Sequence, residues 1–223
     1  MALAEIQDYI NSISDTTVTD YANYWKTITP ATDQQYYNRW RFAFLSVHCS
    51  WKSNVRAYSH LEKSDNPTDK QQLQQQIVYT RVGLIKMRTN GLWKFQQDYW
   101  ADPRKFRKKA DENWDEFRDR TMNMCHGLGY AKSAFAIELC YPNECEVTCL
   151  DTHALQLYEY DTKKLGTPGP AKYKEMEKHW VETCKARNIP QFMARNIYWD
   201  KVQEQPNSRY WSSVFETPET VIT

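Results

Sequence analysis

Apolar residues along the chain recur mostly at spacings of three and four, which is the period of amphipathic α-helices. Gln, Lys, Glu and Arg, which favour helix, are plentiful, while the chain holds 6 Gly and 9 Pro. The first 32 residues fit one short helix and a second that is capped near Ser14 and ended by Pro30. The strongest hydrophobic signal lies within residues 34–61, which are apolar nearly all round up to His48, as is typical of a central helix.

Turns divide the rest of the chain into further helices. A Gln-rich helix follows the turn at Pro67 and is expected to break at Gly83 or Gly91. Beyond a Pro-Gly linker, two more helices are expected at residues 172–187 and 190–203. The pattern therefore predicts an all-α protein without an internal repeat.

With 223 residues, 14% of them aromatic, the chain can bury one substantial core or two small ones. No apolar run approaches the roughly 20 residues that span a bilayer, and acidic residues stand where a signal peptide would be basic. We therefore expect a soluble intracellular monomer, in the cytoplasm or nucleoid of a bacterial or host cell, with no membrane partner. The 6 cysteines lack zinc-site spacing, so we expect reduced, mostly buried thiols and no bound metal.

Positive charge is concentrated in one stretch of a chain whose net charge is +1. Residues 81–109 hold nine Lys and Arg against two Asp, a local excess of seven. Such a patch can attract a polyanion. A solvated helix face is the alternative interpretation.

The stretch from His126 to Tyr130 places Gly127 and Gly129 on either side of Leu128, between two predicted helical segments. Glycines permit positive φ and close backbone approach, so this turn and the start of the next helix can direct amides at a phosphate. An ordinary turn of a helical hairpin is the alternative.

Asp151 follows the apolar residues 147–150 at the predicted N-terminus of another helix. The helix dipole favours a carboxylate at this position. Such an anion can stabilise a sugar cation or orient a nucleophile at an anomeric carbon. Alternatively, Asp151 only caps the helix through the amides of His153 or Ala154, and the two roles are compatible.

These two motifs, Gly127-Leu128-Gly129-Tyr130 and Leu150-Asp151-Thr152-His153, resemble those of the helix-hairpin-helix DNA glycosylases, the superfamily of endonuclease III and archaeal 8-oxoguanine glycosylase. Residues 44–50 also resemble a segment of that family, in the same order. The resemblance implies an all-α, two-lobed glycosylase fold with DNA bound at the cleft. One lobe would comprise residues 1–33 and 161–223, and the other residues 34–160 with the hairpin at 126–133.

The resemblance also implies roles for individual residues. Asp151 matches the catalytic aspartate, and the turn from His126 to Tyr130, with Lys132 and His153, would contact DNA. The turn often binds a monovalent cation in this family, and no other cofactor is implied. His48 falls where the family places a wedge that enters the duplex when a base is flipped out. A capped or buried histidine near a helix end is the alternative for His48.

Two features depart from the family. Members with lyase activity carry a lysine directly after the residue that matches Tyr130, but Ala131 occupies that position and Lys132 comes next. One residue along a helix rotates a side chain by about 100°, so a phosphate contact or a solvated lysine is favoured over a Schiff-base nucleophile for Lys132. The four-cysteine iron-sulfur loop is missing, since Cys184 is the only cysteine after Cys149.

Aromatic and cationic side chains are dense in residues 195–200 and 208–211, where they either stack on bases or face the core. This segment and the compact size resemble, more weakly, the phage α-glutamyl/putrescinyl-thymine pyrophosphorylases. For those proteins the implied reaction is displacement of pyrophosphate by an amine on pyrophosphorylated 5-hydroxymethyluracil in DNA.

The sequence therefore predicts an enzyme that flips a modified or damaged base into a cleft and acts on it by DNA N-glycosylase chemistry. Asp151 would be the catalytic carboxylate, and Lys132 is kept as a second candidate. Base hypermodification on the same fold, a non-catalytic helix-hairpin-helix DNA-binding module and a helical protein adaptor are the alternatives.

Overall fold

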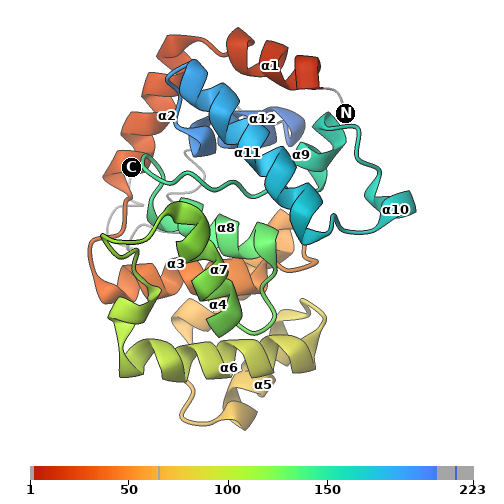
Figure 1. Cartoon of the computed structure of the whole chain (residues 1–223). Helices are drawn as coiled ribbons and strands as arrows, with labels where there is room; N and C mark the ends of the chain where they lie inside the picture. The colour runs from red at the N-terminus through yellow and green to blue at the C-terminus, as the bar shows by residue number, and fades with distance from the viewer. Residues whose placement is uncertain (1–2, 65, 205–213, 215–223) are drawn as a thin grey trace. The chain divides into compact units, whose positions relative to one another are not determined.

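The computed structural model describes residues 3–64, 66–204 and 214 of the chain (Figure 1). These residues form twelve α-helices, one 3-10 helix and no strand, which confirms the predicted all-α class. In chain order the elements are α1 (Leu3–Ser12), α2 (Asp15–Thr27), α3 (Asp33–Leu45), α4 (Trp51–Lys63), α5 (Lys70–Thr80), α6 (Ile85–Ala101), η1 (Pro103–Phe106), α7 (Trp114–Met124), α8 (Tyr130–Cys140), α9 (Thr152–Leu157), α10 (Thr162–Leu165), α11 (Pro170–Ala186) and α12 (Gln191–Val202).

Side-chain caps explain where several helices begin. The Ser14 hydroxyl accepts the Thr17 N–H at the start of α2, as the sequence predicts. Thr32 caps α3 and Asn113 caps α7, each in a reciprocal capping box with the third residue of the helix. These caps satisfy N–H groups that have no acceptor within the helix.

The expected central helix is two helices, α3 and α4. His48 lies between them with φ 46°, in the left-handed region, and Ser50 caps α4 by accepting the Ser53 N–H. Of the two breaks considered in the Gln-rich stretch, the one at Gly83 is correct, because α5 ends at Thr80 and α6 begins at Ile85. Gly91 lies inside α6.

The chain forms two compact units. Unit 1 comprises residues 1–29 and 137–223, and unit 2 comprises residues 30–136. The chain passes from unit 2 back to unit 1 inside α8, between residues 136 and 137. Residues 147–158 belong to unit 1, where α11 and α12 hold them.

In unit 1, α11 and α12 pack against each other, α1 packs against α11, and both α2 and α9 pack against α12. Trp25, Trp180 and Phe192 are fully buried in this core. The Trp25 and Phe192 rings meet edge to face with centroids 4.7 Å apart. In unit 1 the N-terminal helices α1 and α2 therefore pack against α11 and α12, which come from the last third of the chain.

In unit 2, α3 and α5 each pack against both α4 and α6 (Figure 1). The α3 residues Trp40, Phe42 and Leu45 are fully buried, which confirms that the apolar stretch is central. Phe95 of α6 stacks on Tyr37 of α3 with centroids 5.4 Å apart. This aromatic core supports the turns described below.

All 6 cysteines lie among the described residues, and none of them forms a disulfide; Cys49 is half-buried and the others are buried. Burial raises the pKa of Cys125, Cys145 and Cys184. These thiols are therefore poor nucleophiles. Within the described ranges, no helix combines the length and apolar character needed to cross a membrane.

Candidate functional site

Residues 147–150 are a fully buried, non-helical segment of unit 1 that leads into Asp151. Buried backbone groups need hydrogen-bond partners, and here side chains of neighbouring helices provide them. Glu177 accepts the Thr148 N–H at 2.8 Å. The Tyr173 hydroxyl donates to the Thr148 carbonyl at 2.6 Å and accepts the Leu150 N–H at 3.1 Å. The segment is thereby fixed without belonging to a sheet.

Glu138 of α8 and Arg195 of α12 form a buried ion pair beside this segment. Glu138 Oε1 accepts Arg195 Nε–H at 2.9 Å, and Oε2 lies 2.6 Å from Arg195 Nη2. Oε1 also accepts the Cys149 N–H at 3.1 Å. Burial, opposed by Arg195 and the Cys149 N–H, raises the pKa of Glu138 to about 7. The pair therefore holds the backbone two residues before Asp151.

Asp151 is the N-cap of α9. Its Oδ1 accepts the N–H groups of His153 and Ala154, each at 3.0 Å, so the capping role considered from the sequence is confirmed. Its own N–H donates to the Cys149 carbonyl at 2.9 Å. Within the described residues Oδ2 accepts no hydrogen bond, and the side chain is partly exposed. One carboxylate oxygen is thus anchored while the other can meet a ligand.

The surroundings of Asp151 come from α9 and α12. Burial raises the pKa of Tyr198, and the nearby Asp151 charge adds to this effect. The Tyr198 ring meets Tyr9 edge to face at 5.1 Å between centroids. His153 Nε2 lies 3.0 Å from Gln203 Nε2. The carboxylate therefore shares unit 1 with a partly exposed aromatic ring and a partly exposed imidazole.

The supporting residues Glu138, Tyr173 and Glu177 were missed in the sequence. The available signal was an acidic residue inside an apolar helix, as for Glu138 in residues 134–139. A charged side chain at a core-facing position needs a partner, which points to a polar network.

The polar residues of the aromatic and cationic segment 195–200 are buried. Arg195, Asn196 and Asp200 are all at most 4% exposed. Asp200 accepts the buried Tyr21 hydroxyl at 2.7 Å. Arg195 and Asp200 are therefore engaged by Glu138 and Tyr21 inside unit 1, whereas Tyr198 and Trp199 are partly exposed. A base-stacking role for these aromatic residues stays a prediction. Residues 208–211, which shared that interpretation, lie outside the described residues.

The glycine turn lies in unit 2, between α7 and α8. Gly127 has φ +98°, which strains any residue with a Cβ. The Leu128 N–H donates to the Cys125 carbonyl at 3.0 Å, and the Leu128 side chain is 5% exposed. Leu128 therefore anchors the turn with its side chain, while His126, Gly127 and Gly129 are exposed.

Gly129 differs from Gly127, because its φ is not positive and an added Cβ would meet nothing within 4 Å. Neither backbone strain nor packing requires glycine here. The Ser133 N–H donates to the Gly129 carbonyl at 2.9 Å and starts the hydrogen bonds of α8. The amides that precede Ser133 are thus oriented along the start of an 11-residue helix, with open space beside them.

Gly91 of α6 contacts the hairpin directly. A Cβ at Gly91 would lie 2.6 Å from the His126 carbonyl oxygen, a distance that real Cβ atoms do not adopt. Close packing with the hairpin therefore explains the glycine that the sequence suggested as a helix break.

Lys132 is half-buried on the first turn of α8. Its ammonium lies 5.4 Å from the centre of the Phe135 ring, which is a cation-π geometry. At the first residue of α8, the Tyr130 ring lies 4.9 Å from the guanidinium of Arg118 on α7. The contact with the Phe135 ring therefore positions the Lys132 ammonium.

Arg88 joins the turn that carries His48 to the turn between α5 and α6. Its buried guanidinium donates to the carbonyls of Leu45 and Val47 in the first turn and of Val82 and Gly83 in the second. His48 is exposed on the turn between α3 and α4. Leu84, on the other, has φ 47° and is 46% exposed.

Leu84 was not singled out in the sequence, and its apolar character in a turn was the available signal. The structure thus gathers His48, Leu84, the hairpin and Lys132 in unit 2, and Asp151 with His153 in unit 1. Among the described residues no group of three or more His, Cys, Asp or Glu could hold a metal ion.

No protein-family model matches this sequence, and no curated protein matches it. Solved structures are similar in fold. The 8-oxoguanine DNA glycosylase of Thermotoga maritima superimposes with a TM-score of 0.72 and 12% identity over 92% of this chain and 100% of that chain.

The 8-oxoguanine glycosylase/lyase of Methanocaldococcus jannaschii, solved with a 15mer DNA containing 8-oxoguanine, gives a TM-score of 0.72 and 14% identity over 91% of this chain and 97% of that chain. A second structure of the M. jannaschii glycosylase gives a TM-score of 0.71 and 15% identity over 92% of this chain and 95% of that chain. The chain therefore has the fold of the 8-oxoguanine DNA glycosylases, as the sequence motifs implied.

Proposed function

We propose that this protein is a DNA-processing enzyme of the N-glycosylase type, with Asp151 as its catalytic carboxylate. The observation that carries the proposal is the geometry of Asp151: Oδ1 is fixed by two amides, and Oδ2 accepts no bond within the described residues. The buried segment behind it limits its motion. Preorganised charge of this kind stabilises a developing cation at little reorganisation cost.

In the proposed reaction, the bond between the deoxyribose C1′ and the base nitrogen breaks, and the electron pair leaves with the base. Asp151 stabilises the positive charge that develops on the sugar. Water then adds at C1′, and the proton that it loses is balanced by one that the departing base nitrogen takes up from solvent, which leaves neutral free base and an abasic site. The hairpin holds a backbone phosphate through the amides at the start of α8, with the monovalent cation at this turn as a further prediction.

DNA carrying a panel of modified bases, including 8-oxoguanine and pyrophosphorylated 5-hydroxymethyluracil, tests this function. Mass spectrometry of released bases and digested nucleosides follows the products, with an amine supplied in parallel reactions. Free base with an abasic site supports the proposal. Released pyrophosphate with an intact strand would identify a hypermodifying transferase, and salt-sensitive binding without any product would identify a binding module.

Leu84 and His48 are proposed to enter the duplex where the base leaves it, because an apolar wedge can unstack a base step at a cost of a few kcal/mol. We expect Leu84→Ala to lower the rate of base extraction about tenfold, which is the effect of roughly 1.4 kcal/mol. Stopped-flow fluorescence of 2-aminopurine beside the target measures this rate. Val78→Ala, at a residue that is 53% exposed on α5, is the matched control. Equal rates in the two variants would contradict a wedge at Leu84.

Lys132 is proposed to contact phosphate rather than to form a Schiff base, because its ammonium is placed over Phe135 one residue from the family's lysine position. We expect borohydride to trap no protein–DNA adduct, and Lys132→Ala to lower the salt slope of duplex binding by about 0.9. Lys94→Ala, which removes a lysine paired with Asp98, is the control. An adduct formed by the natural protein and absent from Lys132→Ala would instead establish a lyase.

A further inference from the structure

Residues 104–109, here called the basic loop, carry five cations in six positions between α6 and α7. The loop is anchored at both ends of η1. Asp102 caps η1 through the Arg104 N–H, and Phe106 is 1% exposed. The Phe106 ring meets Phe95 edge to face at 5.2 Å and Trp40 at 6.1 Å. The basic loop is therefore fixed to the aromatic core of unit 2.

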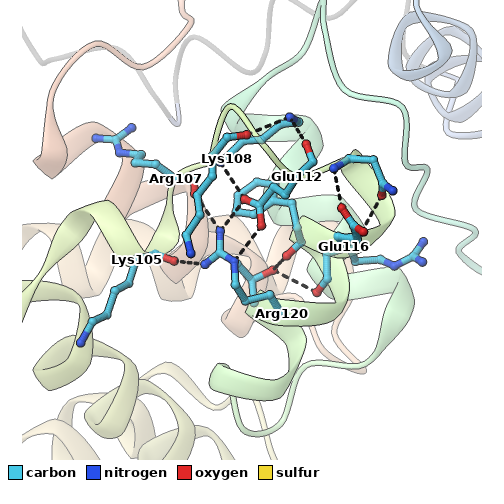
Figure 2. A network of polar contacts seen from close by, with 11 residues as sticks. Lys105, Arg107, Lys108, Glu112, Glu116 and Arg120 are labelled. Atoms are coloured by element: carbon cyan, nitrogen blue, oxygen red, sulfur yellow. Dashed lines mark hydrogen bonds and ion pairs between the residues drawn. The ribbon is translucent and has the colours of Figure 1, made fainter.

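Arg120 of α7 organises the backbone of the basic loop, as Figure 2 shows. Its guanidinium donates to the carbonyls of Lys105 and Arg107 and pairs with Glu112 at 2.6 Å. Glu112 also accepts the Lys109 N–H at 2.7 Å. Carbonyl oxygens that would repel an anion are thus directed toward Arg120.

The cations of the basic loop differ in whether their charged groups have partners within unit 2. Arg107 pairs with Asp33 at 2.6 Å, and Lys108 donates to the carbonyls of Lys109 and Glu112. Lys105 and Lys109 are exposed, and neither ammonium pairs with a carboxylate of the described residues. Figure 2 shows the Lys105 side chain pointing away from the network. The basic loop thus presents two ammonium groups from a braced backbone.

We propose that the basic loop is a second contact for the phosphate backbone of duplex DNA, separate from the glycine hairpin. Helix α7 begins after the basic loop and leads into the hairpin. Its 11 residues span about 17 Å at 1.5 Å per residue. At 3.4 Å of rise per base pair, this length corresponds to about four or five base pairs. The inference rests on the proposed function for the identity of the polyanion.

The test is the salt dependence of binding to an undamaged duplex, measured by fluorescence anisotropy, which requires no base release. Each phosphate contact contributes about 0.9 to the slope of log affinity against log salt, so Lys105→Ala with Lys109→Ala is expected to lower the slope by about 1.8. The loss of affinity between 50 and 200 mM salt then becomes about tenfold smaller than in the natural protein. Lys105→Arg with Lys109→Arg should retain the original slope.

The matched control removes the same charge from another exposed part of unit 2, by Lys63→Ala with Lys70→Ala. A slope unchanged by the loop variant, or lowered as much by the control, would overturn the inference. Binding of polyglutamate as tight as that of DNA, and equally dependent on the two lysines, would also overturn it in favour of an acidic protein partner. If the salt slopes of these variants are as expected but no base is released from any substrate, only the proposed function is contradicted.

Discussion

Asp151→Asn is expected to lower the single-turnover rate of base release by roughly 10³-fold while leaving the fold and DNA affinity nearly unchanged. The amide oxygen of Asn can still accept the N–H groups of His153 and Ala154, and Asn caps helices about as well as Asp. What is lost is the negative charge and the acceptor at Oδ2. The rate is measured with enzyme in excess over DNA, and the fold by thermal unfolding.

Asp161→Asn provides a control of the same chemistry. Asp161 caps α10 in unit 1, and its Oδ1 accepts the N–H groups of Lys163 and Lys164 at 2.9 and 3.3 Å. Both substitutions therefore remove one carboxylate charge from an N-cap, but only Asp151 follows the buried segment. Undiminished base release by Asp151→Asn would refute the catalytic assignment, and an equal loss in Asp161→Asn would attribute the effect to charge alone.

The helices and the position of Asp151 could be predicted because both depend on local sequence. Helical periodicity and caps such as Ser14 act over a few residues, and the structure has them where they were expected. The N-cap role of Asp151 follows from the same local rule. The turn that separates α3 from α4 was missed because Val47 and neighbouring residues are apolar and buried, so their pattern continues that of the helix.

Contacts between distant residues could not be predicted from one sequence. Glu138 and Arg195 are 57 positions apart, and nothing local to either identifies the other. Similarly, Arg88 joins two turns by carbonyl groups, which every residue possesses. The sequence therefore predicted the N-cap position of Asp151, but not the buried groups that hold the segment before it.

The buried ion pair between Glu138 and Arg195 is expected to contribute strongly to stability. Arg195→Met is expected to lower the free energy of unfolding by about 3–5 kcal/mol, because it leaves the fully buried Glu138 carboxylate without its cation. Urea unfolding followed by the intrinsic fluorescence of the 9 tryptophans, among them the fully buried Trp180, measures the change. Lys201→Met, at an exposed lysine of α12, is the control and should change stability by at most about 0.5 kcal/mol. A loss no larger than that of the control would show that the ion pair is dispensable.

The loss in the free energy of unfolding caused by Arg195→Met should increase as the pH rises. Burial raises the pKa of Glu138 to about 7 in the folded protein, against 4.5 for an ordinary Glu, and removing Arg195 removes an interaction that lowers it. A folded-state pKa above the unfolded value contributes stability that is complete below about pH 4.5 and is lost as the pH rises through the folded pKa. The difference in the free energy of unfolding between Arg195→Met and the natural protein should therefore be smaller at pH 5 than at pH 8.

Adding Glu138→Gln to Arg195→Met separates the charge from the hydrogen bond. Gln retains an oxygen that can accept the Cys149 N–H, as Glu138 Oε1 does at 3.1 Å, but it has no charge to bury. The double variant should therefore recover part of the lost stability and lose the additional pH dependence of Arg195→Met. If instead the two substitutions add without recovery, the cost of Arg195→Met comes from its packing rather than from an unpaired carboxylate, because independent effects add and coupled charges do not.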